Sequence, residues 1–230
     1  MLGRRAFRQA DEPVFAGTSK GAHALGPMND FGLPRPRIRK LGEPDYVPAP
    51  ELWDWTQSTF IIEDAELANP DHSHLSDAYI GCLWAWQEME KSDRRIVGTA
   101  QLGEPTGTVW AVGQRRQQLA EWFGRVPDFL ITIDAEYFTD CTEGEACALL
   151  EHELYHCAQA ADKEGEPRFN HDGDPVWKIR GHDVEEFVGV IERYGAEATY
   201  TEAVRRAFER GPKITAAVLR GICGICAKAA

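Results

Sequence analysis

The chain has 230 residues, of which 43% are hydrophobic and 27% are charged, and its formal net charge is −12. This length and apolar content suffice for one sizeable core and exclude a wholly disordered chain. No apolar run approaches the roughly 18 residues that a membrane-spanning helix needs, and no apolar stretch follows Arg4 and Arg5 as an export signal would require. We therefore expect a cytoplasmic protein with no membrane partner.

The charge is distributed unevenly along the chain. Residues 1–40 hold eight Lys or Arg against three Asp or Glu, a net charge of +5, which leaves −17 for the remaining residues. An acidic body repels phosphate, so the composition argues against nucleic acid as a partner. Residues 1–50 are also rich in Gly and Pro, which predicts a disordered or extended basic arm. A folded domain is expected over residues 51–195, with a helical tail over residues 196–230.

The first elements after the arm are predicted from hydrophobic spacing and turn residues. Pro50 opens a short helix over residues 51–60. Apolar residues that recur at helical spacing predict a longer helix over residues 75–91. Residues 95–102 and 107–112 are predicted as strands, because both are apolar and Gly and Pro separate them.

The next elements lead to the helix with the clearest sequence signals. Residues 115–124 are predicted as a helix that ends at its glycine, and the apolar residues 128–134 as a buried strand. Thr142 and Glu145 have the spacing of a capping box. Apolar residues then continue the helical pattern to about Ala161.

The rest of the chain is predicted to be mainly helical after a Gly- and Pro-rich loop. A helix is expected over residues 182–193, followed by one or two helices within residues 196–220. Cys223 and Cys226 form a single CxxC pair. Since a zinc ribbon needs a second pair, we interpret them as part of an ordinary helical tail.

The helix that follows Thr142 contains the sequence His152-Glu153-Leu154-Tyr155-His156. Two histidines four residues apart lie on one helical face, so both imidazoles can reach a single metal ion. Zinc lowers the pKa of a bound water, and the glutamate beside the first histidine can accept its proton. The pattern therefore predicts His152 and His156 as zinc ligands and Glu153 as the catalytic base. Only about 0.02 chance matches to the bare pattern are expected at this composition.

A catalytic zinc takes three protein ligands and leaves a fourth position for water. The metzincin extension is excluded, because Gln159 and Asp162 occupy the positions where that class needs Gly and His. The third ligand must therefore come from later in the chain. The candidates are the histidines and glutamates of the following loop and helix start, which are His171, His182, Glu185 and Glu186.

Residues 150–156, followed by residues 181–187, resemble the putative phage metallopeptidase family, and the resemblance covers roughly residues 60–190. The pattern is also similar to SprT-like zincins, in which HExxH is followed by a histidine at the start of a helix and a nearby phenylalanine. The resemblance implies His182 as the third ligand. It departs from the SprT-like pattern in one extra acidic residue and in the lack of a glycine after the histidine. Glu186 is the first alternative.

These features together predict an α+β, zincin-like fold. A small sheet from residues 95–134 is expected to pack against the HExxH helix, with further helices at 75–91 and 182–193. The predicted function is that of a zinc metallopeptidase that cleaves a protein or peptide substrate with Glu153 as general base. An alternative is a zinc-stabilised, non-catalytic binding protein of phage or prophage origin. A SprT-like protease of DNA-bound proteins is a third hypothesis, against which the acidic body argues.

Overall fold

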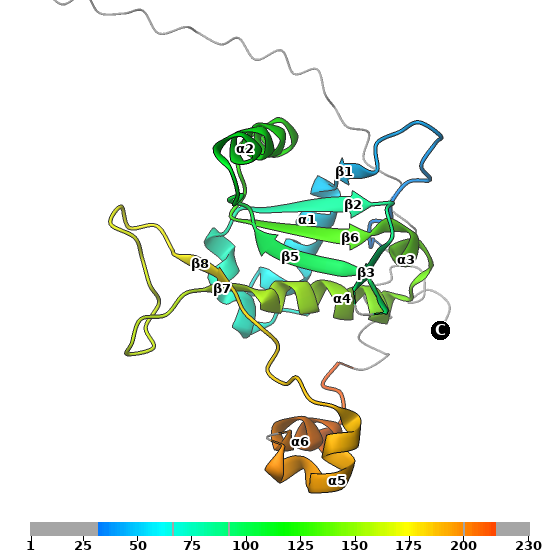
Figure 1. Cartoon of the computed structure of the whole chain (residues 1–230), viewed down its shortest axis with the longest axis vertical. Coiled ribbons are helices and arrows are strands. Elements are labelled where there is room, and N and C mark those ends of the chain that lie inside the picture. Colours follow the sequence, from blue (N-terminus) through cyan, green and yellow to red (C-terminus); the bar gives the residue numbers. More distant parts are fainter. Residues whose placement is uncertain (1–31, 66, 92, 200, 215–230) are drawn as a thin grey trace, which may run out of the picture.

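A four-stranded mixed sheet forms the centre of the molecule, as the computed structural model shows for residues 32–214 except 66, 92 and 200 (Figure 1). The strand order is β1 (Tyr46–Pro48), β2 (Ile80–Ala85), β6 (Phe129–Asp134) and β5 (Gly98–Leu102). β2 and β6 pair in parallel, whereas β1 and β5 pair antiparallel at the two edges. β2 is apolar throughout, and β6 is apolar except for Thr132 and Asp134, as expected for central strands with both faces covered.

The larger core lies between the sheet and the helices α1 (Pro50–Thr56) and α4 (Glu143–His156). Alternate residues of β2 and β6 point into this core, whereas Leu83 and Leu130 point to the other face. There they pack on Leu119 of α2 (Val109–Phe123). α4 therefore lies directly against one face of the sheet, which fixes the direction in which its polar side chains point.

Shorter elements complete the described chain. A π-helical turn, η1 (Gln57–Ile61), extends α1, and a 3₁₀ helix, η2 (Pro70–Asp77), precedes β2. The remaining elements are β3 (Met89–Lys91), β4 (Arg94–Ile96), α3 (Ala135–Asp140), β7 (Cys157–Gln159), β8 (Trp177–Ile179), α5 (Val188–Ala198) and α6 (Glu202–Arg210). α5 and α6 lie apart from the sheet in Figure 1 and contribute no buried residue.

The predicted α+β fold class is confirmed, but two of the predicted elements are wrong. The helix expected to continue to about Ala161 also ends earlier, at His156, because β7 begins at Cys157. Residues 75–91 do not form a helix, because they include the end of η2, the strand β2 and the strand β3. A strand buried on both faces is apolar without alternation, so it also satisfies helical spacing. Residues 107–112 are not a strand, because the Thr108 side chain accepts a hydrogen bond from the Ala111 amide and caps α2.

Three other predicted elements agree with the structure, and two more are present with different bounds. The helix at 51–60, the strand at 128–134 and the helix that ends before Gly124 are confirmed in α1 with η1, in β6 and in α2. The predicted strand at 95–102 is divided between β4 and β5. The helix expected at 182–193 begins later, at Val188. Residues 215–230, with Cys223 and Cys226, lie outside the described residues.

The described part of the expected N-terminal arm packs on the domain. Leu33 is 1% exposed and belongs to the larger core. The Arg35 guanidinium donates hydrogen bonds to the carbonyl groups of Phe138 and Cys141, at the end of α3. The division of the chain at residues 50 and 195 stays a prediction. No helix in the described ranges is long and apolar enough to cross a membrane.

Candidate metal centre

The histidines of the HExxH sequence are carried by a well-anchored helix. The predicted capping box of α4 is present, since the Thr142 hydroxyl accepts from the Glu145 amide and the Glu145 carboxylate accepts from the Thr142 amide at 2.8 Å. Leu150 and Leu154 are 1% and 0% exposed and hold the helix against the sheet. The helical period then places His152 and His156 on a face that the core does not cover.

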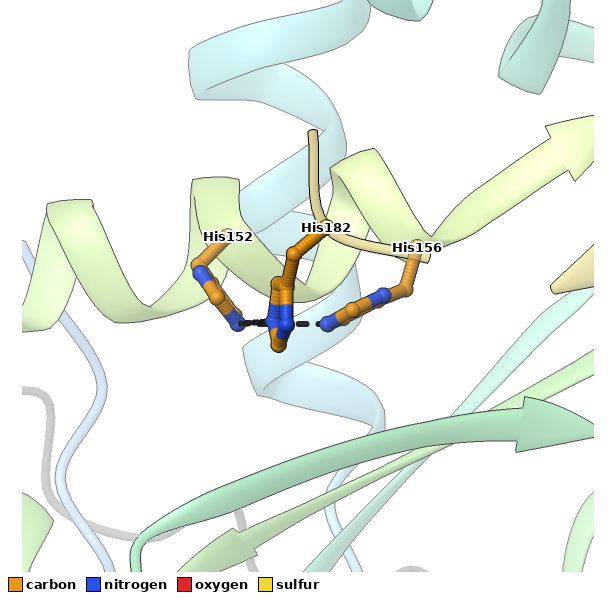
Figure 2. A group of neighbouring side chains, drawn as sticks. All are labelled: His152, His156 and His182. Carbon is orange, nitrogen blue, oxygen red and sulfur yellow. Dashed lines mark hydrogen bonds between the residues drawn. The ribbon is translucent and has the colours of Figure 1, made fainter. Parts of the chain in front are cut away.

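His182 approaches the same point from a different part of the chain, as Figure 2 shows. Nε2 of His152 lies 3.2 Å from Nε2 of His156 and 3.3 Å from Nε2 of His182. A tetrahedral zinc with Zn–N bonds of about 2.0–2.1 Å separates its ligand nitrogens by about 3.3 Å. The two distances from His152 therefore match the separation of neighbouring ligands on one tetrahedral zinc ion. Within the described part of the chain, these three residues are the group whose ligand atoms converge, all within 4.8 Å.

A hydrogen bond to the Arg180 carbonyl determines the tautomer of His156. Its Nδ1 lies 2.6 Å from the carbonyl oxygen of Arg180. Because a carbonyl only accepts, Nδ1 carries the proton and Nε2 keeps a free lone pair for a metal. Burial, followed by the neighbouring His156 and His182, lowers the pKa of His152. A neutral imidazole is the form that binds a metal ion.

The backbone of β8 sets the position of His182. The Arg180 amide donates to the His156 carbonyl at 2.9 Å, just after β8 pairs with β7. The end of α4 and the end of β8 are thereby joined, and His182 follows two residues later. The expectation that His182 begins a helix is wrong, because residues 180–187 have no regular structure and α5 begins at Val188.

The other candidates for a third ligand lie outside the cluster. The side chain of His171 is fully exposed in the loop between β7 and β8. A carboxylate oxygen of Glu186 accepts a hydrogen bond from the Phe187 amide at 2.8 Å. Glu185 lies nearest, with Oε1 at 3.7 Å from Nδ1 of His182, on the side of the ring away from His152.

Glu153 points from α4 toward the edge strand β5. Its side chain is 3% exposed, and its Oε2 atom is buried without a hydrogen-bond partner among the described residues. Burial raises the pKa of Glu153 to about 7, against the smaller opposing effects of His156 and of the Ala100 amide. A buried carboxylate oxygen with no protein partner is a candidate to bind a water molecule.

A cavity of about 340 Å³ opens beside the histidines. Besides the three imidazoles, Tyr155, Arg180, Val184 and Val204 contribute to its walls. Tyr155, between the two histidines of HExxH, is 37% exposed, and its hydroxyl donates to the Asp71 carboxylate at 2.9 Å. No local pattern in the sequence indicates this contact between η2 and α4.

Two further residues near the site are buried. Cys157 is 1% exposed, and burial raises the pKa of its thiol. His72 is completely buried against the ring of Tyr155, with the ring centroids 4.6 Å apart. The burial follows from the packing of η2 on α4, which hydrophobic spacing does not reveal.

Comparison with known proteins agrees with this geometry. A family described as putative phage metallopeptidase matches residues 53–210, which include α4, β8 and His182. No curated protein and no solved structure matches the chain. A metallopeptidase family implies a metal ion and protein substrates. Since the match extends over more than half of the sequence, the chain belongs to the putative phage metallopeptidase family.

Proposed function

We propose that the protein is a zinc-dependent peptidase in which His152, His156 and His182 hold the metal and Glu153 is the general base. The observation that carries the proposal is the convergence of three imidazole nitrogens beside a buried carboxylate. Three neutral nitrogen ligands suit zinc, whereas magnesium and calcium prefer oxygen. When bound, zinc activates a water for attack and polarises a carbonyl group.

Glu153 has the properties that a general base needs. Burial brings its pKa to about 7, so the carboxylate can both accept and release a proton near neutral pH. Its unpartnered Oε2 atom is available to a water molecule. After attack, the protonated Glu153 is the group that can return the proton to the leaving amine. Arg180 fixes the tautomer of His156 throughout, because its carbonyl accepts from Nδ1.

One observation favours the alternative of a zinc-stabilised, non-catalytic binding protein. The Glu153 side chain is 3% exposed and does not contribute to the walls of the cavity beside the histidines. In a binding protein, the metal would serve to join α4 to the segment after β8. The two functions therefore differ in whether Glu153 is needed for hydrolysis.

The first test is the metal content of purified protein. We expect wild type to hold one zinc per chain and the His152→Ala/His156→Ala variant to hold none, because two of the three ligands are absent. Elemental analysis measures both. Equal zinc in the two proteins would reject the site.

Glu153→Gln separates the two functions. We expect this variant to keep its zinc and its fold, because Glu153 is no ligand, and to lose about 10²–10⁴-fold of peptide hydrolysis. Digestion of an unbiased peptide library measures the loss. Equal activity of wild type and variant would reject the role of Glu153, and equal inactivity would favour the binding protein.

A further inference from the structure

We propose that Gly98, in the edge strand β5, is a positioning residue for Glu153. The absence of a side chain at Gly98 leaves the space that the Glu153 carboxylate occupies beside the histidines. This inference rests on the proposed function, because it assigns Gly98 to the placement of the general base.

The register of the sheet directs residue 98 at α4. Gly98 is paired with Ile133 and Ala100 with Ile131, and both isoleucines point into the core beneath α4. Residues two apart on a strand share a face, so Gly98 and Ala100 both face α4. The carboxylate of Glu153 lies against this stretch of β5, because its Oε1 atom is 2.6 Å from the position that a Cβ atom on Gly98 would take.

A side chain at position 98 would require the neighbouring side chains to move. A Cβ atom on Gly98 would lie 2.6 Å from Oε1 of Glu153 and 2.9 Å from Cδ1 of Leu149. Both separations are under 3.0 Å, which Cβ atoms in proteins essentially never show, and both atoms are the ends of side chains that can shift. Any other residue would therefore push the carboxylate or the leucine away from β5.

The backbone conformation at position 98 does not explain why this residue is glycine. Gly98 is not among the described glycines with positive φ, so its backbone is accessible to other residues. Glycine is also unfavourable in a strand, because it loses more conformational freedom than other residues and packs no side chain. What requires glycine at position 98 is the space taken by Glu153 and Leu149.

The consequence for the proposed reaction is specific. The nearest atoms to a Cβ at position 98 belong to Glu153 and Leu149 and not to the three histidines, so Gly98→Ala should leave zinc affinity within about twofold of wild type. Displacement of the carboxylate by about 1 Å should lower kcat about 10²-fold, since misplacement on this scale has that cost. KM should be nearly unchanged, because Gly98 does not contribute to the walls of the cavity beside the histidines.

The experiment is a double-mutant cycle on the full chain between Gly98→Ala and Glu153→Ala, measured by urea unfolding of the chelator-treated protein. We expect Gly98→Ala to lower the urea midpoint clearly in the chain with Glu153 and much less in the Glu153→Ala chain. Removing the carboxylate removes the closer of the two contacts. Zinc affinity and kcat are measured on the same variants.

Gly81→Ala is the matched control. Gly81 lies in β2 of the same sheet, and a Cβ there would meet the ring of Phe123 at 2.9 Å, on the α2 side. Its effect on the urea midpoint should be the same with and without Glu153. Equal destabilisation by Gly98→Ala in both backgrounds would overturn the inference. The urea midpoints could show coupling between Gly98→Ala and Glu153→Ala in a protein that has no peptidase activity. That outcome would support the role of Gly98 in placing Glu153 and reject the proposed enzymatic function.

Discussion

The two regions that supply the histidines are built very differently. α4 carries His152 and His156 and is capped at its start and packed on the sheet by buried leucines. Residues 180–187 carry His182, have no regular structure and contain no buried residue. The comparison shows that two ligands are fixed by a helix, whereas the third is fixed by the hydrogen bonds that tie the Arg180 backbone to the carbonyl group and the ring of His156.

The same contrast extends beyond the site. The segment after His182 leads into α5 and α6, which contribute no buried residue, and Phe187 and Phe208 are 80% and 82% exposed. Few buried apolar contacts indicate low local stability. Metal binding would therefore stabilise the second region more than the first, because it joins His182 to a helix that is already held by the core.

The largest expected effect comes from His182→Ala. This change removes a ligand from the weaker region, and we expect zinc affinity to fall more than about 100-fold, beyond the range typical of residues that only orient a ligand. Competition with a chromogenic chelator measures the affinity.

His171→Ala and Glu186→Ala are the controls for that measurement. His171 is fully exposed in the preceding loop, and the Glu186 carboxylate contacts the adjacent amide, so neither change should alter zinc affinity by more than a few-fold. Unchanged affinity in His182→Ala together with a large loss in Glu186→Ala would assign the third ligand to Glu186.

Metal removal should have an intermediate effect, an increase in backbone hydrogen exchange that is confined to the region of His182. After chelation, we expect faster hydrogen exchange at the Arg180 amide and through residues 180–187, while the α4 amides from Leu150 to Leu154 stay protected. The reason is that only the second region depends on the metal for its position. Mass spectrometry of peptic fragments measures the exchange. An equal loss of protection in α4 would contradict the claim that only the region of His182 depends on the metal for its position.

The smallest effect is expected in the capped helix. Thr142→Ala removes one hydrogen bond of the capping box and should lower the free energy of unfolding by about 1 kcal/mol, without changing zinc affinity. Urea unfolding of the metal-free protein measures the change. Thr108→Ala is the matched control at the start of α2, where the cap bond is 3.4 Å against 3.3 Å at Thr142. The expected loss is smaller there, because the Thr142 hydroxyl also donates to the Glu145 carboxylate, whereas Ala111 offers Thr108 no such acceptor. A cost at Thr142 no larger than at Thr108 would contradict the role of the capping box.

The sequence predicted what depends on local spacing. A cap at Thr142 and apolar residues at helical period indicate α4, and the interval between His152 and His156 then places both on one face. Glu153 follows from its place in the same pattern. A family resemblance implies His182, but its predicted place at a helix start is wrong.

What local spacing could not show was decided by tertiary packing. Residues 75–91 contain a strand with both faces covered, and burial on two sides removes the alternation that marks a strand. Gly98 has no signal in the sequence, because its importance arises only where β5 crosses Glu153. The sequence by itself determined the helix, two histidines and the glutamate, since these lie within a few residues of one another. Only the tertiary structure brought His182 to them, because its position depends on the pairing of β7 with β8 and on the Arg180 backbone, some 24 residues beyond His156.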